Sequence, residues 1–348
     1  MTATAVETAA ARPGYGVRAL VERGLAYLIL VGLAVWLVAN FLKAPGQSSS
    51  SLVDGLSNGA LYSLIALGYT LVYGIIELIN FAHGDLFMLG SVFSAFFLVK
   101  WLGVTGTGAA AIGALILTLV CSMLFCASIN VAAERVAYRR LRRAPKLAAL
   151  ITAVGLSFIF QWVGLQWNGS APKQWPSVVK GNFHVLTVRV EYSTILVVLV
   201  TVPVLLFLSF IVQKTRQGKA MRATAQDQDA ARLMGINVDR TIAFTFALGG
   251  AMAGAAGTLY VQSIGTTRFD SGFQLGLIAF TAAVMGGIGN LNGAVLGGLL
   301  IGLIQGLNDG APYGLGQKWS QTVVFTILIL IMVFKPQGLL GKQTTEKV

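Results

Sequence analysis

Charged side chains are scarce in this chain. Only 11% of its 348 residues are Asp, Glu, Lys or Arg, whereas a soluble domain carries about 25%. This shortage excludes an ordinary soluble globular protein. A membrane-spanning helix needs about 20 apolar residues, and seven stretches of about that length or more contain no charged residue. These stretches are 24–42, 55–76, 101–133, 147–172, 192–213, 241–267 and 271–308.

The apolar stretches also lack the alternation of apolar and polar residues that marks the strands of an outer-membrane barrel. They are continuous instead. Within a bilayer the backbone must satisfy its own hydrogen bonds, which leaves helices as the structure for such runs. The sequence therefore predicts an all-α integral membrane protein.

Cysteine and histidine are too few to suggest a metal centre. Cys121 and Cys126 lie in one apolar run, where they are typical of small buried hydrophobic residues rather than of a disulfide. His83 and His184 lie in different parts of the chain. We therefore expect no metal site.

A phosphate-binding loop is also missing. The segment 338–342 comes nearest to the Gly-x-x-x-x-Gly-Lys-Ser/Thr pattern, but Gln343 follows it where Ser or Thr is required. The uncharged stretches hold no carboxylate of the kind that couples transport to protons or sodium. We therefore expect no enzyme activity and no cofactor in this chain, with ATP and Mg²⁺ bound by a separate subunit.

Most of the charged residues are basic. The chain has 25 Lys and Arg residues and 13 Asp and Glu residues, which gives a net charge of +12. The basic residues flank apolar stretches, as they do on the cytoplasmic side of membrane proteins, so we expect a lipid bilayer and no nucleic acid as partner. Arg12, Arg18 and Arg23 place residues 1–23 in the cytoplasm. This tail lacks the apolar core and cleavage site of a signal peptide.

Counting spans from a cytoplasmic N-terminus gives a consistent topology. Single spans are expected at 24–42, 55–76, 79–99, 109–132, 147–168, 192–212, 241–262 and 320–334. Residues 43–51 are an expected external loop, whereas 134–146, with six basic residues and one acid, lie inside. The membrane domain then covers 24–335, and a second cytoplasmic tail covers 336–348.

The apolar run 274–307 is too long for one span. More than 30 residues would make a helix of roughly 50 Å, against a hydrocarbon core of about 30 Å. The glycine-rich segment 286–293 is the expected break. The two halves form either two short spans or a re-entrant pair, since broken backbone is tolerated where protein or water covers it. The expected total is 8–10 spanning helices.

Two groups of polar and turn residues mark helix junctions: Asn80, His83, Gly84 and Asp85, and the pair Asn290 and Asn292. Capping and turn formation account for such groups at helix ends. Alternatively, they line the inner mouth of a translocation path or its gate, since polar groups at membrane depth tend to be functional.

Glycines recur four residues apart, as in Gly250 and Gly254, or in Gly298, Gly302 and Gly306. This spacing places them on one helix face and permits close backbone approach. Ordinary packing between helices explains such a face. The alternative is a dimer or pathway face that needs narrow side chains.

The longest strongly polar stretch, 213–240, lies between two expected spans. Residues 229–236 read Asp-Ala-Ala-Arg-Leu-Met-Gly-Ile and resemble the Glu-Ala-Ala-x-x-x-Gly pattern of ABC importer permeases, with Asp in place of Glu. The resemblance implies a short cytoplasmic coupling helix that docks in a groove of an ATPase. The implied contact residues are Asp229, Ala230, Ala231 and Gly235. The alanines would keep the surface flat and the glycine would end or bend the helix; a solvated amphipathic loop is the alternative.

Further segments carry a closer resemblance. Residues 58–76, 79–85 and 279–298 are similar to the branched-chain amino acid ABC permease family, LivH type. The resemblance covers about 52–340. The departures are Asp in the coupling pattern and the extra tail at the N-terminus.

This resemblance implies a permease subunit of an ATP-driven importer in the bacterial cytoplasmic membrane. It would move branched-chain or related hydrophobic amino acids by alternating access. The implied partners are a second permease chain, in a homo- or heterodimer, two cytoplasmic ABC ATPases and an extracytoplasmic substrate-binding protein. Two alternatives stay open: a urea or short-chain amide ABC permease, and a stand-alone channel or secondary carrier.

Overall fold

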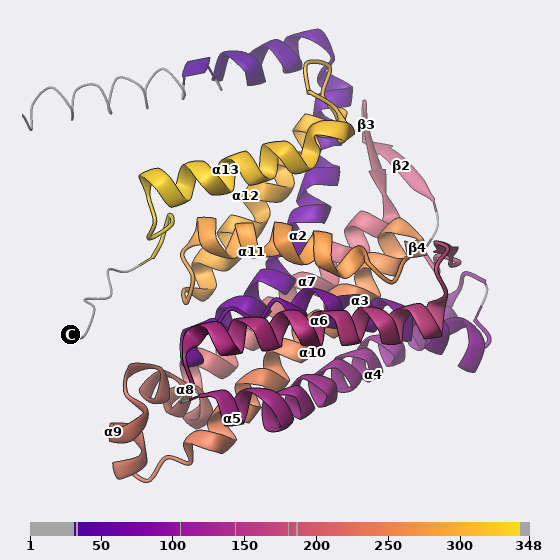
Figure 1. Ribbon diagram of the computed structural model, residues 1–348. Coiled ribbons are helices and arrows are strands. Elements are labelled where there is room, and N and C mark those ends of the chain that lie inside the picture. Colours follow the sequence, from indigo (N-terminus) through magenta and orange to yellow (C-terminus); the bar gives the residue numbers. More distant parts are fainter. Residues whose placement is uncertain are drawn as a thin grey trace, which may run out of the picture.

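The computed structural model describes residues 31–341, except 33, 105, 143, 180 and 186 and the side chain of Lys146. The described part of the chain is a bundle of helices (Figure 1). Eight of them are long and apolar enough to cross a membrane, which confirms the predicted all-α membrane fold. The predicted tail 1–23 lies outside the described residues.

Most of the helices follow one another with short connections, whereas residues 169–191 between α6 and α7 carry three short strands. After a short helix, Ala34–Lys43, come α2 (Pro45–Ile76), α3 (Ala82–Phe96), α4 (Ala109–Ala133), α5 (Arg139–Leu141), α6 (Lys146–Asn168), α7 (Tyr192–Lys214), α8 (Arg216–Gln226), α9 (Gln228–Leu233), α10 (Val238–Ile264), α11 (Ser271–Gly286), α12 (Leu291–Gly310) and α13 (Ser320–Phe334). π-helical turns at Phe97–Trp101 and Glu134–Tyr138 extend α3 and α4, and a 3₁₀ turn at Gln317–Trp319 precedes α13.

Four short strands lie at the end of the bundle opposite α5, α8 and α9 (Figure 1). β1 (Lys173–Gln174) pairs antiparallel with β4 (Thr266–Thr267), and β2 (Asn182–Val185) pairs antiparallel with β3 (Val188–Glu191). The first pair ties the connection between α6 and α7 to the connection between α10 and α11.

The start of α2 corrects one prediction, because residues 43–51 are not a loop. α2 begins at Pro45, and proline suits the first helical turn because an N–H there would be unpaired. The hydroxyls of Ser50 and Ser51 donate to carbonyl oxygens four residues earlier, so the helix itself satisfies these polar groups. Ser51 is buried against Gly306 of α12. The serine run therefore forms the first turns of a 32-residue helix, in which Ser48 and Ser51 are buried.

α2 and α12 pack on each other through glycines. A Cβ added at Gly59 would lie 2.9 Å from the Cα of Leu299, and one added at Gly298 would lie 2.6 Å from the Cα of Ser63. A Cβ at Gly302 would overlap with backbone atoms of Gly59. Missing side chains let two backbones approach closely. At these positions the glycine face therefore serves packing within the chain, rather than a dimer contact.

α10 forms the centre of the bundle by the same means. Gly254 packs against the backbone of α4, and Gly257 packs against the backbone of Ser91 in α3. Cys126 is fully buried in this region and Cys121 is partly buried. Both cysteines are free.

The predicted break in the long apolar run is confirmed. α11 ends at Gly286 and α12 begins at Leu291, with Gly287 and Gly289 at φ +105° and +90°. L side chains rarely adopt such φ values, so glycine suits both positions. The N–H of Leu339 donates to the Met285 carbonyl at 2.8 Å, so the segment after α13 covers the break.

Candidate functional site: the α9 surface and the helix junctions

The polar stretch 213–240 folds into α8 and α9 at one end of the bundle (Figure 1). The Thr215 side chain caps the start of α8. The Asp227 carboxylate caps α9 by accepting from the N–H groups of Asp229, at 2.8 Å, and Ala230, at 3.0 Å. Such caps satisfy the donors that a helix start leaves unpaired. The stretch is therefore helical, as the coupling pattern predicts, rather than an irregular loop.

Gly235 ends α9 through a defined motif. Its φ is +80°, its N–H donates to the Arg232 carbonyl, and the N–H of Ile236 donates to the Ala231 carbonyl, both at 3.0 Å. This pair of bonds is the Schellman motif, which needs a left-handed residue after the helix. A Cβ at Gly235 would meet nothing within 4 Å. Backbone conformation, rather than space, therefore makes glycine the favoured residue here.

The outer surface of α9 differs in part from the prediction. Asp229 and Ala230 are exposed, but Ala231 is only 3% exposed and packs inward. Sequence reasoning also missed two residues: Leu233 is 90% exposed and Met234 is 82% exposed. The sequence did contain a signal for them, because two large apolar residues lie at the end of a short helix in an otherwise charged segment.

An ion cluster joins the start of α10 to the end of α4. Arg142 pairs with Glu134 through one guanidinium nitrogen and, at 2.6 Å, with Asp239 through another. Arg139 also pairs with Asp239. Asp239 follows Gly235 by four residues. The cluster thus fixes the segment that leaves α9 against the segment that leads from α4 into α6.

The first predicted gate group lies at the junction of α2 and α3 and is buried. Asn80 does not cap α3; its Oδ1 accepts from the Tyr138 hydroxyl at 2.7 Å. His83 is 1% exposed and its ring lies 4.9 Å from that of Tyr69, edge to face. In the described residues, neither ring nitrogen of His83 has a hydrogen-bond partner. Both side chains are therefore buried within this chain.

Gly84 and Asp85 are buried against other helices. A Cβ at Gly84 would lie 2.7 Å from the Cα of Gly276 in α11. The Asp85 carboxylate accepts from the Ser157 hydroxyl and, at 3.3 Å, from the Gln161 amide, both in α6. The junction of α2 and α3 thus contacts α6 and α11 together.

The second predicted pair lies at the break between α11 and α12. Asn290 caps α12, because its Oδ1 accepts from the Gly293 N–H at 3.2 Å, and its amide donates to the Leu340 carbonyl at 2.7 Å. Asn290 is therefore a capping residue. Asn292 is exposed and lines a pocket.

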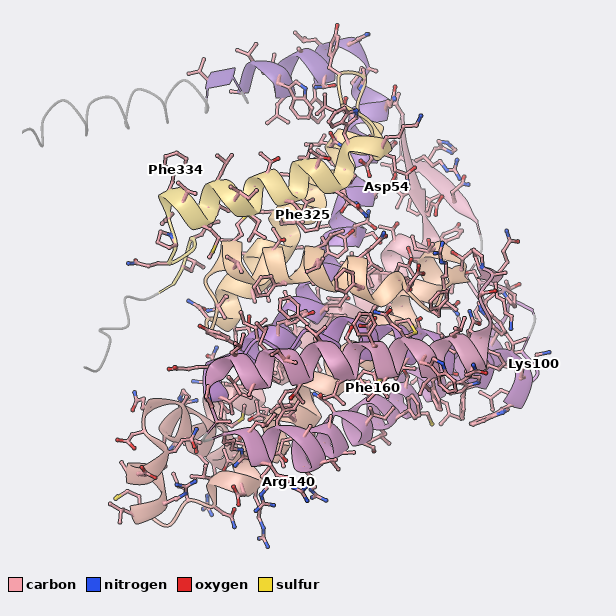
Figure 2. All side chains as sticks on the ribbon, viewed as in Figure 1. Asp54, Lys100, Arg140, Phe160, Phe325 and Phe334 are labelled. Atoms are coloured by element: carbon pink, nitrogen blue, oxygen red, sulfur yellow. The ribbon has the colours of Figure 1, made fainter. Side chains whose placement is uncertain are left out.

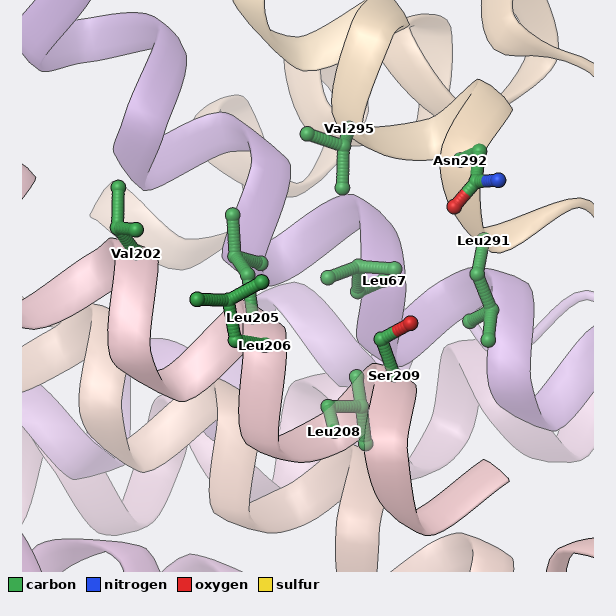
Figure 3. Close-up of a pocket in the computed structure, with 9 residues that line it drawn as sticks. All are labelled: Leu67, Val202, Leu205, Leu206, Leu208, Ser209, Leu291, Asn292 and Val295. Atoms are coloured by element: carbon green, nitrogen blue, oxygen red, sulfur yellow. The ribbon is translucent and has the colours of Figure 1, made fainter. Parts of the chain in front are cut away.

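The pocket that Asn292 lines has a volume of about 320 Å³ and lies between α2, α7 and α12 (Figure 3). Its walls are mainly apolar, with Ser209 as a second polar residue. The other lining residues are Leu67, Val202, Leu205, Leu206, Leu208, Leu291 and Val295. The structure thus places Asn292 on the α7 side of α12, whereas the Asn80 group faces α6 and α11. Among the described residues, no group of three or more His, Cys, Asp or Glu side chains could hold a metal ion.

Eight candidate spans, a broken helix pair and an exposed helical segment between two spans together are typical of a multi-pass integral membrane protein. The family model described as "Branched-chain amino acid transport system / permease component" matches residues 51–333. The chain therefore belongs to this family of permease components.

Individual relatives agree with the family model. The chain is 39% identical to the high-affinity branched-chain amino acid transport system permease protein BraD of Pseudomonas aeruginosa, over 85% of this chain and 97% of the relative. It is 39% identical to LivH of Escherichia coli K12, over 85% and 96%, and 25% identical to a probable LivH of Methanocaldococcus jannaschii, over 82% and 91%. No solved structure matches significantly.

Proposed function

We propose that this protein is the permease subunit of an ATP-driven importer of branched-chain or related hydrophobic amino acids. The observation that carries the proposal is 39% identity to BraD over 97% of that protein's length, since BraD is named for branched-chain amino acid transport. The similarity covers 85% of this chain rather than one motif. ATP is hydrolysed on separate subunits, because this sequence has no phosphate-binding loop.

The end of the bundle that carries α8 and α9 faces the cytoplasm. Figure 2 places Arg140 at this end and Lys100 at the opposite end. Basic side chains are more numerous at the α9 end, which is the pattern of cytoplasmic segments. At that end they are Arg135, Arg139, Arg140, Arg142, Lys214, Arg216, Lys219, Arg222, Arg232, Arg240 and Lys335. We propose this orientation in the bacterial cytoplasmic membrane, together with the cytoplasmic position of both termini that the sequence predicts.

α9 is the contact for a cytoplasmic ATPase. Leu233 and Met234 project large apolar side chains beside the exposed Asp229 and Ala230, and buried apolar anchors within a polar rim are typical of protein interfaces. Closure of two ATPases around ATP would move α9 and switch the path between inward- and outward-facing states. A second permease chain would complete the translocation path. An extracytoplasmic binding protein would deliver substrate at the end of the bundle that carries the four short strands.

The substrate assignment is tested by uptake in cells. A bacterial strain without high-affinity leucine uptake is supplied with this permease and the other subunits of its system. Uptake of labelled leucine at micromolar concentration is expected, with inhibition by unlabelled isoleucine and valine but not by urea. Uptake that urea inhibits and isoleucine does not would contradict the assignment.

Replacing Gly235 with valine is expected to abolish uptake. Valine strongly disfavours the φ of +80° that ends α9, so the helix end and the exposed pair Leu233 and Met234 would be displaced. Affinity of the extracytoplasmic binding protein for leucine should be unchanged, because that protein does not contact α9. The measurement is labelled leucine uptake together with the amount of permease in the membrane.

Gly316 provides the matched control for this variant. It has a φ of +87° and open space around its Cβ position, but lies at the opposite end of the bundle, before α13. Gly316→Val therefore imposes similar strain far from α9 and should keep most of the uptake. Equal losses in both variants would mean that strain alone, and not the position of α9, causes the defect.

A further inference from the structure

Asp85 is a carboxylate buried near the middle of the membrane domain. Its side chain is inaccessible to solvent, and its partner Ser157 lies ten residues after Leu147, where the α6 candidate span begins. Ten residues of helix are about 15 Å long, half of a hydrocarbon core of about 30 Å. An ionisable group at this depth is costly to keep and is usually retained for function.

The two oxygens of Asp85 face different helices. Oδ2 accepts from Ser157 and Gln161 of α6, whereas Oδ1 has no hydrogen-bond partner among the described residues. Oδ1 lies beside the first turn of α11: a Cβ added at Gly272 would be 2.8 Å from it. The Asp270 side chain does not cap α11. The first turn of α11 therefore offers a positive helix end within reach of the free oxygen.

α6 is held to the bundle along one narrow face. Its buried residues recur at helical spacing and are mostly small: Ala149, Ala153, Ser157, Phe160, Gly164 and Asn168. Its other faces expose large apolar side chains, among them Ile151, Phe158, Ile159 and Trp162. Figure 1 shows α6 along the outside of the bundle. Leu156, Phe160 and Trp167 of α6 also pack against the core. The contact of Ser157 and Gln161 with Asp85 adds polar hydrogen bonds to this buried face.

We propose that Asp85 is a latch with two positions, which holds α6 against α3 in the state seen here. In the other state the carboxylate leaves Ser157 and Gln161 and accepts from backbone N–H groups of the first turn of α11 that follow Ser271, whose own N–H donates to the Arg268 carbonyl. This exchange frees α6 to move. The carboxylate keeps donors in both states, so the exchange avoids an unpaired buried charge. Asp85 is thus a positioning residue for transport. This inference rests on the proposed function as an importer.

Ser157→Ala tests the latch, because it removes the hydroxyl that holds the carboxylate to α6. Thr152→Ala is the matched control: the Thr152 hydroxyl is also on α6 but donates to the Ala148 carbonyl of its own helix. The complete complex is reconstituted in proteoliposomes with its ATPases and binding protein. Leucine uptake, ATP hydrolysis with and without the binding protein, and the melting temperature of the complex are measured.

We expect Ser157→Ala to lower the leucine transported per ATP hydrolysed by about tenfold, as loss of a hydrogen bond to a charged group would. ATP hydrolysis without the binding protein should rise, and the melting temperature should stay near that of Thr152→Ala. Ser157→Thr restores the hydroxyl and should restore coupling. If uptake and hydrolysis fall in proportion with a lower melting temperature, or if both alanine variants behave alike, the latch is wrong. Failure of the unaltered complex to take up leucine would instead overturn the proposed function.

Discussion

Replacing Gly302 with leucine is expected to prevent the protein from accumulating in folded form. Any Cβ at this position overlaps with the backbone of Gly59 in α2. Backbone atoms cannot move aside as a flexible side chain can, so α2 and α12 must separate. Overpacking costs about 1–3 kcal/mol even where side chains relax. We expect a larger loss of stability here because α2 contributes many residues to the hydrophobic core. Membrane-inserted, protease-resistant protein should fall below detection.

Gly113→Leu is the control for this prediction. Gly113 also lies in a membrane helix, α4, but a Cβ there meets nothing within 4 Å. The leucine would project from an already apolar helix face, so the amount of folded protein should match the unaltered chain. If Gly302→Leu accumulates as well as Gly113→Leu does, α2 and α12 do not pack as the structure shows.

Replacing Arg142 with alanine is expected to have the second largest effect. Arg142 neutralises Glu134, whose side chain is only 2% exposed, and also pairs with the half-exposed Asp239. Removing one partner of a buried ion pair leaves an uncompensated charge and costs about 3–5 kcal/mol. The variant complex should melt at a lower temperature, and uptake should fall with it, because Glu134 is left as an unpaired buried charge and Asp239 keeps only its pair with Arg139.

The double variant Arg142→Leu, Glu134→Leu distinguishes the effect of the buried charge on stability from the effect of lost side-chain packing. It removes both buried charges and keeps apolar volume, a change that is often neutral for buried ion pairs. We expect its melting temperature to recover most of the loss. If the double variant is as unstable as Arg142→Ala, the buried charge of Glu134 is not the cause of the instability.

The sequence predicted those features that depend on local composition. Runs without charge located most of the candidate spans after residue 45, and glycine content located the break between α11 and α12 at Gly287 and Gly289. The end of α9 at Gly235 followed from the preference of a left-handed residue for glycine. Each of these signals acts within a few residues, so no knowledge of the fold was needed.

Features that depend on partners distant in the chain could not be predicted in this way. The serines before residue 52 looked like a loop, because their burial depends on the glycines of α12. Asn80 looked like a helix cap, but its partner, Tyr138, is 58 residues away. Asp85 was singled out as a polar junction residue, whereas its contact with Ser157 is visible only in three dimensions.

The surface of α9 also has features that the sequence motif could not predict. The motif marked Ala230 and Ala231 alike, but helix geometry turns one outward and the other into the core. Leu233 and Met234 carry the largest exposed apolar area of the segment, and no motif position identified them. Their role at the ATPase contact remains a prediction.

Transport by the isolated chain and by the complete complex is the most direct test of the whole account. Proteoliposomes containing this chain alone, and others containing it with its second permease, ATPases and binding protein, are supplied with labelled leucine with and without ATP on the cytoplasmic side. We predict leucine accumulation only in the complete complex with ATP. Leucine flux through the chain alone, independent of ATP, would contradict it and identify a stand-alone channel or carrier.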